Sequence, residues 1–138
     1  MALTKLDEAS IIAIRDCMGA KKKEKILIIS DENKREIGLS LYKNAIELGH
    51  ESFYVEMKSL QYNGQEPPQF IAESMKMADV ILCPTTKSLT HTNARRAASA
   101  LGKRIATFPG ITKEVMIRGL NADYNKGLSS NNNSILFE

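Results

Sequence analysis

The sequence of 138 residues has no tryptophan, few aromatic residues and only two cysteines, Cys17 and Cys83. Both cysteines have apolar neighbours. Two thiols in a chain without a secretory signal indicate a protein of a reducing compartment, in which the cysteines do not form disulfide bonds. The first eight residues carry acidic side chains where a signal peptide needs a basic start, and no apolar run approaches the roughly 18 residues of a membrane-spanning helix. We therefore expect a cytoplasmic protein that does not enter a membrane.

An excess of positive charge is also lacking. The formal net charge is +3, and nearly all of it is accounted for by Lys21, Lys22 and Lys23 beside Lys25. Nucleic-acid binders usually carry a broader basic stripe interleaved with aromatic side chains, and this lysine run contains none. We therefore expect the run to be a solvated connection and the protein to have no nucleic-acid partner.

The composition that is present is typical of a soluble globular domain. Hydrophobic residues make up 43% and charged residues 25% of the sequence. A chain of this length allows one domain of ~100 to 200 residues. Such a domain buries enough surface to fold without a structural metal ion or disulfide bonds. We expect a single folded core.

Hydrophobic periodicity predicts helices that alternate with strands. Apolar residues recur at helical spacing in some segments, and short β-branched runs fill the segments between them. We expect helices over 4–18, 33–48, 67–77, 93–101 and 112–120, and strands over 25–30, 52–57, 79–84 and 104–109. The strand at 52–57 has one poorer-covered face and is placed at a sheet edge.

This alternation requires crossover connections, and therefore a parallel sheet with helices on both faces. With right-handed crossovers the simplest order of the four strands is 2-1-3-4, and an antiparallel neighbour is not expected. The predicted fold class is α/β, a three-layer arrangement of the Rossmann-like or flavodoxin-like type.

The predicted site lies at the carboxyl ends of the strands, where the strand order switches. Ligands of such sheets bind there, which points to Ser30 to Asn33 and to the loop from Pro84 to Thr92. The loop gathers hydroxyls, a lysine and a histidine before a helix start, and such groups can cradle an anion or carboxylate. The alternative is that the hydroxyls only cap the helix and bond loop carbonyls. The candidate residues for substrate access or anion binding are Thr85, Thr86, Lys87, Ser88, Thr90, His91 and Thr92.

No motif in the sequence identifies a reaction. The Lys87-Ser88 pair lacks the glycines of a phosphate-binding loop, and no Gly-x-Gly-x-x-Gly follows the first strand. Cys83 and His91 alone do not supply the three protein ligands of a catalytic zinc, and Cys83 is more typical of an inert core thiol. Asp31 and Glu32 are adjacent, but they fit equally well as helix-start residues favoured by the helix dipole. We therefore assign no catalytic residue and no metal ligand.

Two segments nevertheless resemble a known family. Residues 78 to 98 read Ala-Asp-Val-Ile-Leu-Cys-Pro-Thr-Thr-Lys-Ser-Leu-Thr-His-Thr-Asn-Ala-Arg-Arg-Ala-Ala, residues 104 to 112 read Arg-Ile-Ala-Thr-Phe-Pro-Gly-Ile-Thr, and Ala-Asp-Tyr follows at 122 to 124. This combination resembles the N-terminal domain of leucyl aminopeptidases of the thermophilic aminopeptidase (M29 metallopeptidase) family. Members carry Lys-Ser-Leu-Thr-His-Thr followed by Met-Pro-Gly-Ile, and Phe108 stands at the methionine position.

The resemblance implies a cytoplasmic, homodimeric exopeptidase that removes N-terminal residues from peptide substrates. It also implies two divalent metal ions, zinc, cobalt or manganese, whose ligands lie in a C-terminal domain. No ligand carries over onto these 138 residues, so no cofactor is expected in this chain.

The resemblance covers residues 1 to 124, which we expect to form an α/β N-terminal domain. Residues 125 to 138 are polar and turn-rich with a short apolar end, and are expected to be a tail at which a longer chain has been cut or truncated.

Three functions follow as hypotheses. The chain is the inactive N-terminal domain of a metal-dependent aminopeptidase, a stand-alone module that binds a small phosphate or carboxylate ligand, or an interaction domain with an apolar face left uncovered.

Overall fold

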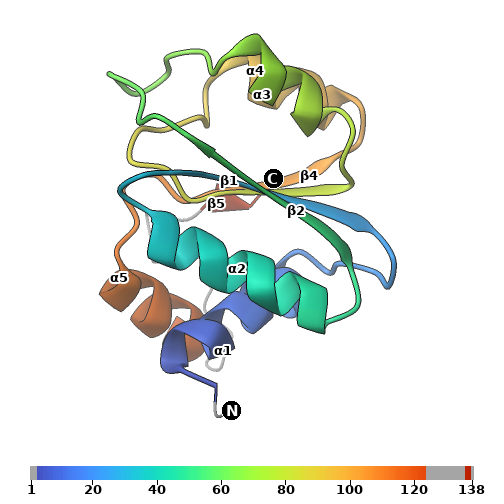
Figure 1. The fold of residues 1–138 in the computed structure, drawn as a ribbon, viewed down its shortest axis with the longest axis vertical. Coiled ribbons are helices and arrows are strands. Elements are labelled where there is room, and N and C mark those ends of the chain that lie inside the picture. Colours follow the sequence, from blue (N-terminus) through green and yellow to red (C-terminus); the bar gives the residue numbers. More distant parts are fainter. Residues whose placement is uncertain (1–2, 124–135, 138) are drawn as a thin grey trace.

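The computed structural model describes residues 3 to 123 and 136 to 137 and contains one five-stranded sheet in the order β2-β1-β3-β4-β5 (Figure 1). The four strands β1 (Lys25–Asp31), β2 (Glu51–Met57), β3 (Val80–Cys83) and β4 (Arg104–Thr107) are parallel. The predicted order 2-1-3-4 and the edge position of β2 are confirmed. The expectation of no antiparallel neighbour is wrong, because β5 (Leu136–Phe137) pairs antiparallel with β4. The rest of the predicted tail lies outside the described residues.

Helices cover both faces of this sheet, as the alternation of elements predicts. One face carries α1 (Lys5–Ile11), α2 (Arg35–Glu47) and α5 (Lys113–Arg118), and the other carries α3 (Gln69–Met75) and α4 (Asn93–Ala100) (Figure 1). Helices α1 and α5 continue as π-helical turns, η1 (Ile12–Cys17) and η2 (Gly119–Asp123), which the periodicity does not predict. In the part of the chain that is described, no helix combines the length and apolar character needed to cross a membrane.

The core consists of two buried clusters, one on each face of the sheet. Successive side chains of a strand point to opposite faces, so β1 and β3 each supply both clusters. The cluster under α1, α2 and α5 includes Ile26, Ile28, Val80, Leu82 and Phe108, and the cluster under α3 and α4 includes Leu27, Ile29, Ile81, Cys83 and Ile105. Burial on both faces explains why these strands are continuous apolar runs in the sequence.

Helix α2 lies unusually close to the sheet at Gly38. A Cβ atom at this position would lie 2.9 Å from the Ser30 Cβ and 2.8 Å from Cε1 of Tyr54. Because glycine has no side chain, the first half of α2 packs directly on the ends of β1 and β2. This packing holds the start of α2 beside the carboxyl edge of the sheet, where the predicted site lies.

Candidate functional site

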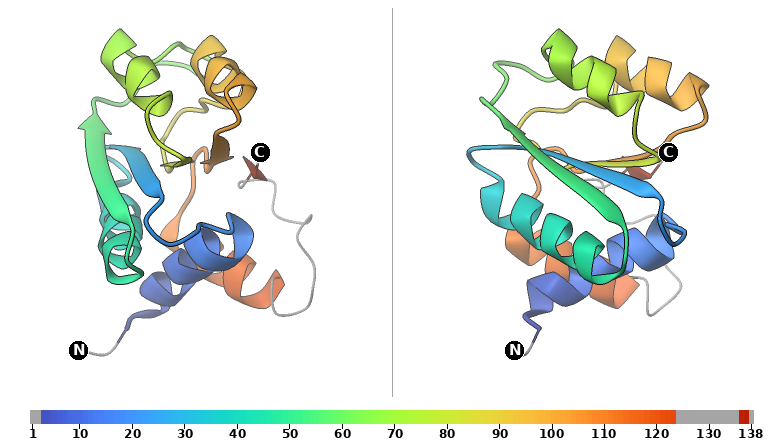
Figure 2. Two further views of the ribbon diagram at one scale, coloured as in Figure 1. Left: turned by 90° about the vertical axis from the view of Figure 1, so that its right-hand side faces the viewer. Right: turned by 45° about the vertical axis from the view of Figure 1, so that its right-hand side comes forward.

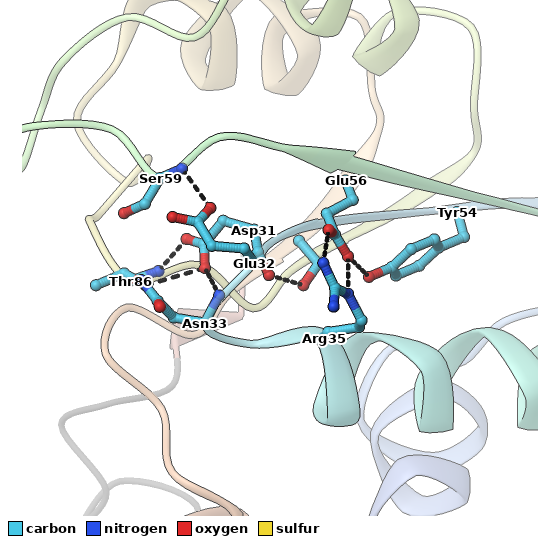
Figure 3. Close-up of polar contacts among 9 residues, drawn as sticks. Asp31, Glu32, Asn33, Arg35, Tyr54, Glu56, Ser59 and Thr86 are labelled. Carbon is cyan, nitrogen blue, oxygen red and sulfur yellow. Dashed lines mark hydrogen bonds and ion pairs between the residues drawn. The ribbon is translucent and has the colours of Figure 1, made fainter.

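The centre of the carboxyl edge is Asp31, the last residue of β1. Its side chain is buried, with the residue only 1% exposed, and its carboxylate accepts three hydrogen bonds (Figure 3). Two come from Thr86, from the amide at 2.6 Å and the hydroxyl at 3.0 Å, and one comes from the Asn33 amide at 3.0 Å. The Asn33 side-chain amide in turn donates to the Thr86 hydroxyl at 3.2 Å. Asp31 therefore fastens the loop after β3 to the end of β1.

The first half of the 84–92 loop is held by its own polar groups. The Thr85 hydroxyl donates to the Lys87 carbonyl at 2.6 Å, and the Ser88 hydroxyl accepts from the Thr90 amide at 3.1 Å. The Ser88 amide donates to Oδ1 of Asn63, in the loop after β2, at 2.8 Å. The bonds of Thr85 and Thr90 are the local turn bonds that Ser and Thr commonly form, whereas the Ser88–Asn63 bond ties the loop to the segment after β2.

The second half of the loop is tied to β4 and to α4. The Thr90 and Thr107 hydroxyls lie 2.8 Å apart in a buried contact. The Thr92 hydroxyl donates to the Leu89 carbonyl at 2.7 Å and accepts from the Arg95 amide at 3.1 Å, so Thr92 is the N-cap of α4. Arg95 also donates through Nε to the Thr90 carbonyl at 2.7 Å. The capping interpretation of the sequence is therefore correct for Thr92.

The start of α4 already has a bound carboxylate from the chain itself. Glu66 accepts from the Asn93 amide at 2.6 Å and from the Ala94 amide at 3.1 Å, while Thr92 accepts from Arg95. The amides of the first helical turn are the donors that an anion would use. They are occupied here by a residue 27 to 28 positions earlier in the chain, a contact that helix and strand periodicity does not predict.

Two side chains of the loop remain available. Lys87 is half-buried and His91 is exposed, and neither side chain forms a hydrogen bond or ion pair with another described residue. All seven predicted site residues are thus brought to one edge of the sheet. Thr85, Thr86, Ser88, Thr90 and Thr92 hold the loop together, whereas the side chains of Lys87 and His91 have no partner within 3–123 and 136–137 and are open to a ligand or a neighbouring domain.

The segment after β4 packs against this loop. The Gly110 amide donates to the Thr85 carbonyl at 2.8 Å, and the Phe108 amide donates to the Cys83 carbonyl at 3.0 Å. Gly110 has φ of 65°, a value that glycine adopts without strain. The two segments that carry the family resemblance are therefore parts of a single surface.

An ion pair borders the site at the end of β2. The Arg35 guanidinium binds the Glu56 carboxylate, which also accepts from the Tyr54 hydroxyl at 2.8 Å (Figure 3). The hydrogen bonds from Arg35 and then Tyr54 lower the pKa of Glu56 to about 2. These contacts fix the start of α2 to the edge strand and keep Glu56 ionised at neutral pH.

Neither the acidic pair nor the cysteine offers a nucleophile or proton carrier. Asp31 binds Thr86, whereas Glu32 accepts from the Ser59 amide at 2.7 Å, so the two carboxylates have separate structural partners. Burial raises the pKa of Cys83 to about 12, which makes its thiol inert. Within residues 3–123 and 136–137, no group of three His, Cys, Asp or Glu side chains could hold a metal ion, so we derive no metal-dependent step.

We expect Asp31→Ala to lower the free energy of unfolding by about 1–3 kcal/mol, because it removes the buried acceptor of three hydrogen bonds from Thr86 and Asn33. The loss should appear in urea unfolding followed by circular dichroism. Hydrogen exchange of the Thr86 amide should also become faster. Glu32→Ala, which removes a more exposed carboxylate one residue away, is the matched control, and an equal effect of both substitutions would contradict the role given to Asp31.

Comparison with known proteins gives a likeness in fold. No protein-family profile matches the sequence, and no curated protein is significantly similar to it. The structure resembles 2,5-dihydroxypyridine dioxygenase from Pseudomonas putida KT2440 with a TM-score of 0.67 at 12% identity, over 86% of this chain and 38% of that one. It also resembles AmpT from Thermus thermophilus, an M29 aminopeptidase, with a TM-score of 0.50 at 14% identity, over 84% of this chain and 41% of that one. The chain thus has the α/β fold of a part of each protein and spans about two fifths of the length of either.

Proposed function

We propose that residues 1 to 124 are the N-terminal α/β domain of a metal-dependent aminopeptidase that releases N-terminal amino acids from peptides. The observation that carries the proposal is the meeting of two segments, Thr85 to Thr92 and Thr107 to Gly110, at the carboxyl edge of the sheet, where the Thr90 and Thr107 hydroxyls and the Gly110 amide and Thr85 carbonyl are in contact. These are the segments in which the sequence resembles M29 aminopeptidases. The likeness in fold to AmpT supports the proposal.

In this proposal the domain does not perform the chemistry itself. Peptide hydrolysis by two metal ions needs several fixed ligands and a bridging water. The proposal therefore places the two divalent ions, zinc, cobalt or manganese, in a second domain. The exposed side of the 84–92 loop, with Lys87 and His91, would line the path of the peptide or the contact between domains. A homodimeric, cytoplasmic enzyme is part of the same proposal.

The chain of 138 residues should be inactive alone. Purified protein incubated with Co²⁺, Zn²⁺ or Mn²⁺ and leucyl-p-nitroanilide is expected to release no p-nitroaniline above the metal-only background, because the described residues offer no metal site. The measurement is absorbance with time, with an active aminopeptidase as positive control. Robust metal-dependent cleavage by this chain would contradict the proposal.

The second candidate is a stand-alone module that binds a small phosphate or carboxylate ligand at the same edge. The Lys87 side chain, which has no partner in the part of the chain that the structure describes, favours it, whereas the occupied amides of Asn93 and Ala94 count against it. A thermal shift scan with nucleotides and simple anions separates the two functions, since a ligand stabilises only the state that binds it. Saturable stabilisation that disappears in Lys87→Ala would favour the module, and no shift with any anion would favour the aminopeptidase domain.

A further inference from the structure

A groove runs between β2 and α3, towards the amino-terminal ends of β1 and β2 and away from the 84–92 loop. Its volume of ≈ 430 Å³ lies within the range of roughly 300–1,000 Å³ that is typical of small-molecule sites. Strands β1 and β2 form one wall and α3 with the turn after it forms the other. Figure 2 shows β2 at the border of the sheet, with α3 over one of its faces.

The floor and walls of this groove are apolar. Leu27 on β1 is buried and forms the floor, and the half-exposed Phe53 stands beside it on β2. Phe70 on α3 and Met77 in the turn after it line the opposite wall and are 74% and 75% exposed. Apolar side chains scattered singly over a surface are ordinary, but three that border one groove are typical of a binding site. A ligand with an apolar side chain would bury these surfaces and displace water from them.

Two opposite charges lie side by side in this groove. Lys25 and Glu51 begin β1 and β2 and are partners in the parallel register, so their Cα atoms are about 4.8 Å apart. Because successive side chains of a strand alternate between faces, both lie on the same face as Leu27 and Phe53. In the part of the chain that the structure describes, neither side chain forms a hydrogen bond or ion pair. An unpaired cation and an unpaired anion are therefore available together.

The other acidic groups near the start of the sheet and on β2 have their own partners. Glu56 lies on the opposite face of β2, where the Arg35 guanidinium and the Tyr54 hydroxyl bind its carboxylate. Asp79 accepts from the Lys25 backbone amide at 2.8 Å, which fixes the start of β1. Glu51 is therefore the carboxylate that this groove offers to a cationic group.

We propose that the groove binds an apolar α-amino acid, with phenylalanine and leucine as examples. The α-ammonium group contacts Glu51 and the α-carboxylate contacts Lys25. The side chain of the ligand lies between Phe53 and the wall made by Phe70 and Met77. An α-amino acid carries its two opposite charges on one carbon, which matches two oppositely charged side chains on neighbouring strands. Exposed ion pairs are weak, so a bond between Lys25 and Glu51 would not keep the ligand out. This inference does not depend on the proposed aminopeptidase function.

Titration of the isotope-labelled chain with L-phenylalanine, followed by amide NMR, tests the proposal. We expect saturable shifts of the Leu27, Phe53 and Ser74 amide signals with a Kd on the order of 1 mM, the affinity that the ligand efficiency of small molecules predicts. Three analogues are matched controls, since hydrocinnamate lacks the ammonium group, phenethylamine lacks the carboxylate and alanine lacks the ring. Each should bind at least about threefold more weakly than L-phenylalanine.

Several outcomes of this titration would overturn the proposal. One is the absence of saturable shifts at concentrations well above the expected Kd. Another is a set of shifts confined to the 84–92 loop. Binding of N-acetyl-phenylalaninamide as tight as that of L-phenylalanine would also overturn it, because the groove would then accept an apolar peptide segment without reading the two charges.

Substitutions at exposed positions check the role of each contact. Glu51→Gln and Lys25→Met should each raise the Kd for L-phenylalanine about three- to fivefold, and Phe53→Ala about fivefold. Glu51→Gln should leave the binding of hydrocinnamate unchanged, because this ligand has no ammonium group. Glu47→Gln and Lys22→Met alter exposed charges outside the groove and should leave the Kd unchanged. Wild-type affinity for L-phenylalanine in both groove charge variants, with unchanged circular dichroism spectra, would contradict the proposal.

Discussion

We expect Phe108→Ala to lower the free energy of unfolding by about 3–5 kcal/mol. Phe108 is fully buried in the cluster under α1, α2 and α5, directly after β4. Alanine would leave a cavity between the sheet and helices α1 and α5, and surrounding side chains fill such cavities only in part. The effect is measured by urea unfolding at equilibrium.

Two further variants make this prediction specific. Phe108→Met restores the residue that the resembled family carries, and its similar volume should limit the loss to less than about 1.5 kcal/mol. Leu101→Ala removes an apolar side chain that is 59% exposed and should change stability by no more than about 0.5 kcal/mol. Unfolding of Phe108→Ala at the same urea concentration as the wild type would contradict the packing described here.

We expect Asp7→Ala to cost about 2–4 kcal/mol, since it removes the acceptor at the centre of a buried polar network. The Asp7 carboxylate accepts from the Ser40 hydroxyl at 2.8 Å and from the Asn44 side chain at 3.0 Å, both on α2. It also accepts from the Thr4 amide at 3.2 Å in the capping box of α1. Lys43→Ala removes only the exposed Nζ at 3.2 Å and should cost less than about 1 kcal/mol.

The same network makes stability depend on pH in a defined direction. Burial by itself raises the pKa of Asp7, but hydrogen bonds from Ser40, Thr4 and Asn44 outweigh it and hold the pKa well below its usual range. A group with a lowered folded-state pKa stabilises the fold fully above its unfolded pKa, ~3.9 for Asp, and loses that contribution as pH falls towards the folded value. The stability difference between wild type and Asp7→Asn should therefore shrink from pH 6 to pH 3. A difference that stays constant over this range would contradict the lowered pKa.

The layered fold could be predicted because its signals are local. The runs at 25–30 and 79–84 are buried on both faces and flanked by amphipathic helices, and these patterns lead directly to a parallel sheet. Strand β5 could not be predicted, since Leu136 and Phe137 are only two residues within a polar segment. The π-helical turns were missed because an apolar stripe of this length does not distinguish i→i+5 from i→i+4 hydrogen bonding.

The position of the 84–92 loop at the carboxyl edge of the sheet could be predicted, but the hydrogen bonds within this candidate site could not. The switch in strand order places the 84–92 loop beside Asp31, and Thr92 is a recognisable N-cap. The bond between Asp31 and Thr86 joins residues 55 positions apart, and the caps from Glu66 to Asn93 and Ala94 span 27 and 28 positions. Such contacts depend on tertiary structure. A carboxylate before Pro67 carries no sequence signal that it will bind a distant helix start.

The most direct test of the proposed function is the activity of the complete product of the encoding gene. We predict that the reading frame continues past Glu138 into a domain with His, Glu and Asp ligands. The whole protein should hydrolyse leucyl-p-nitroanilide only when Zn²⁺, Co²⁺ or Mn²⁺ is bound, and a chelator should abolish the activity. A gene product that ends at Glu138, or a longer one with no metal-dependent hydrolysis, would contradict the assignment.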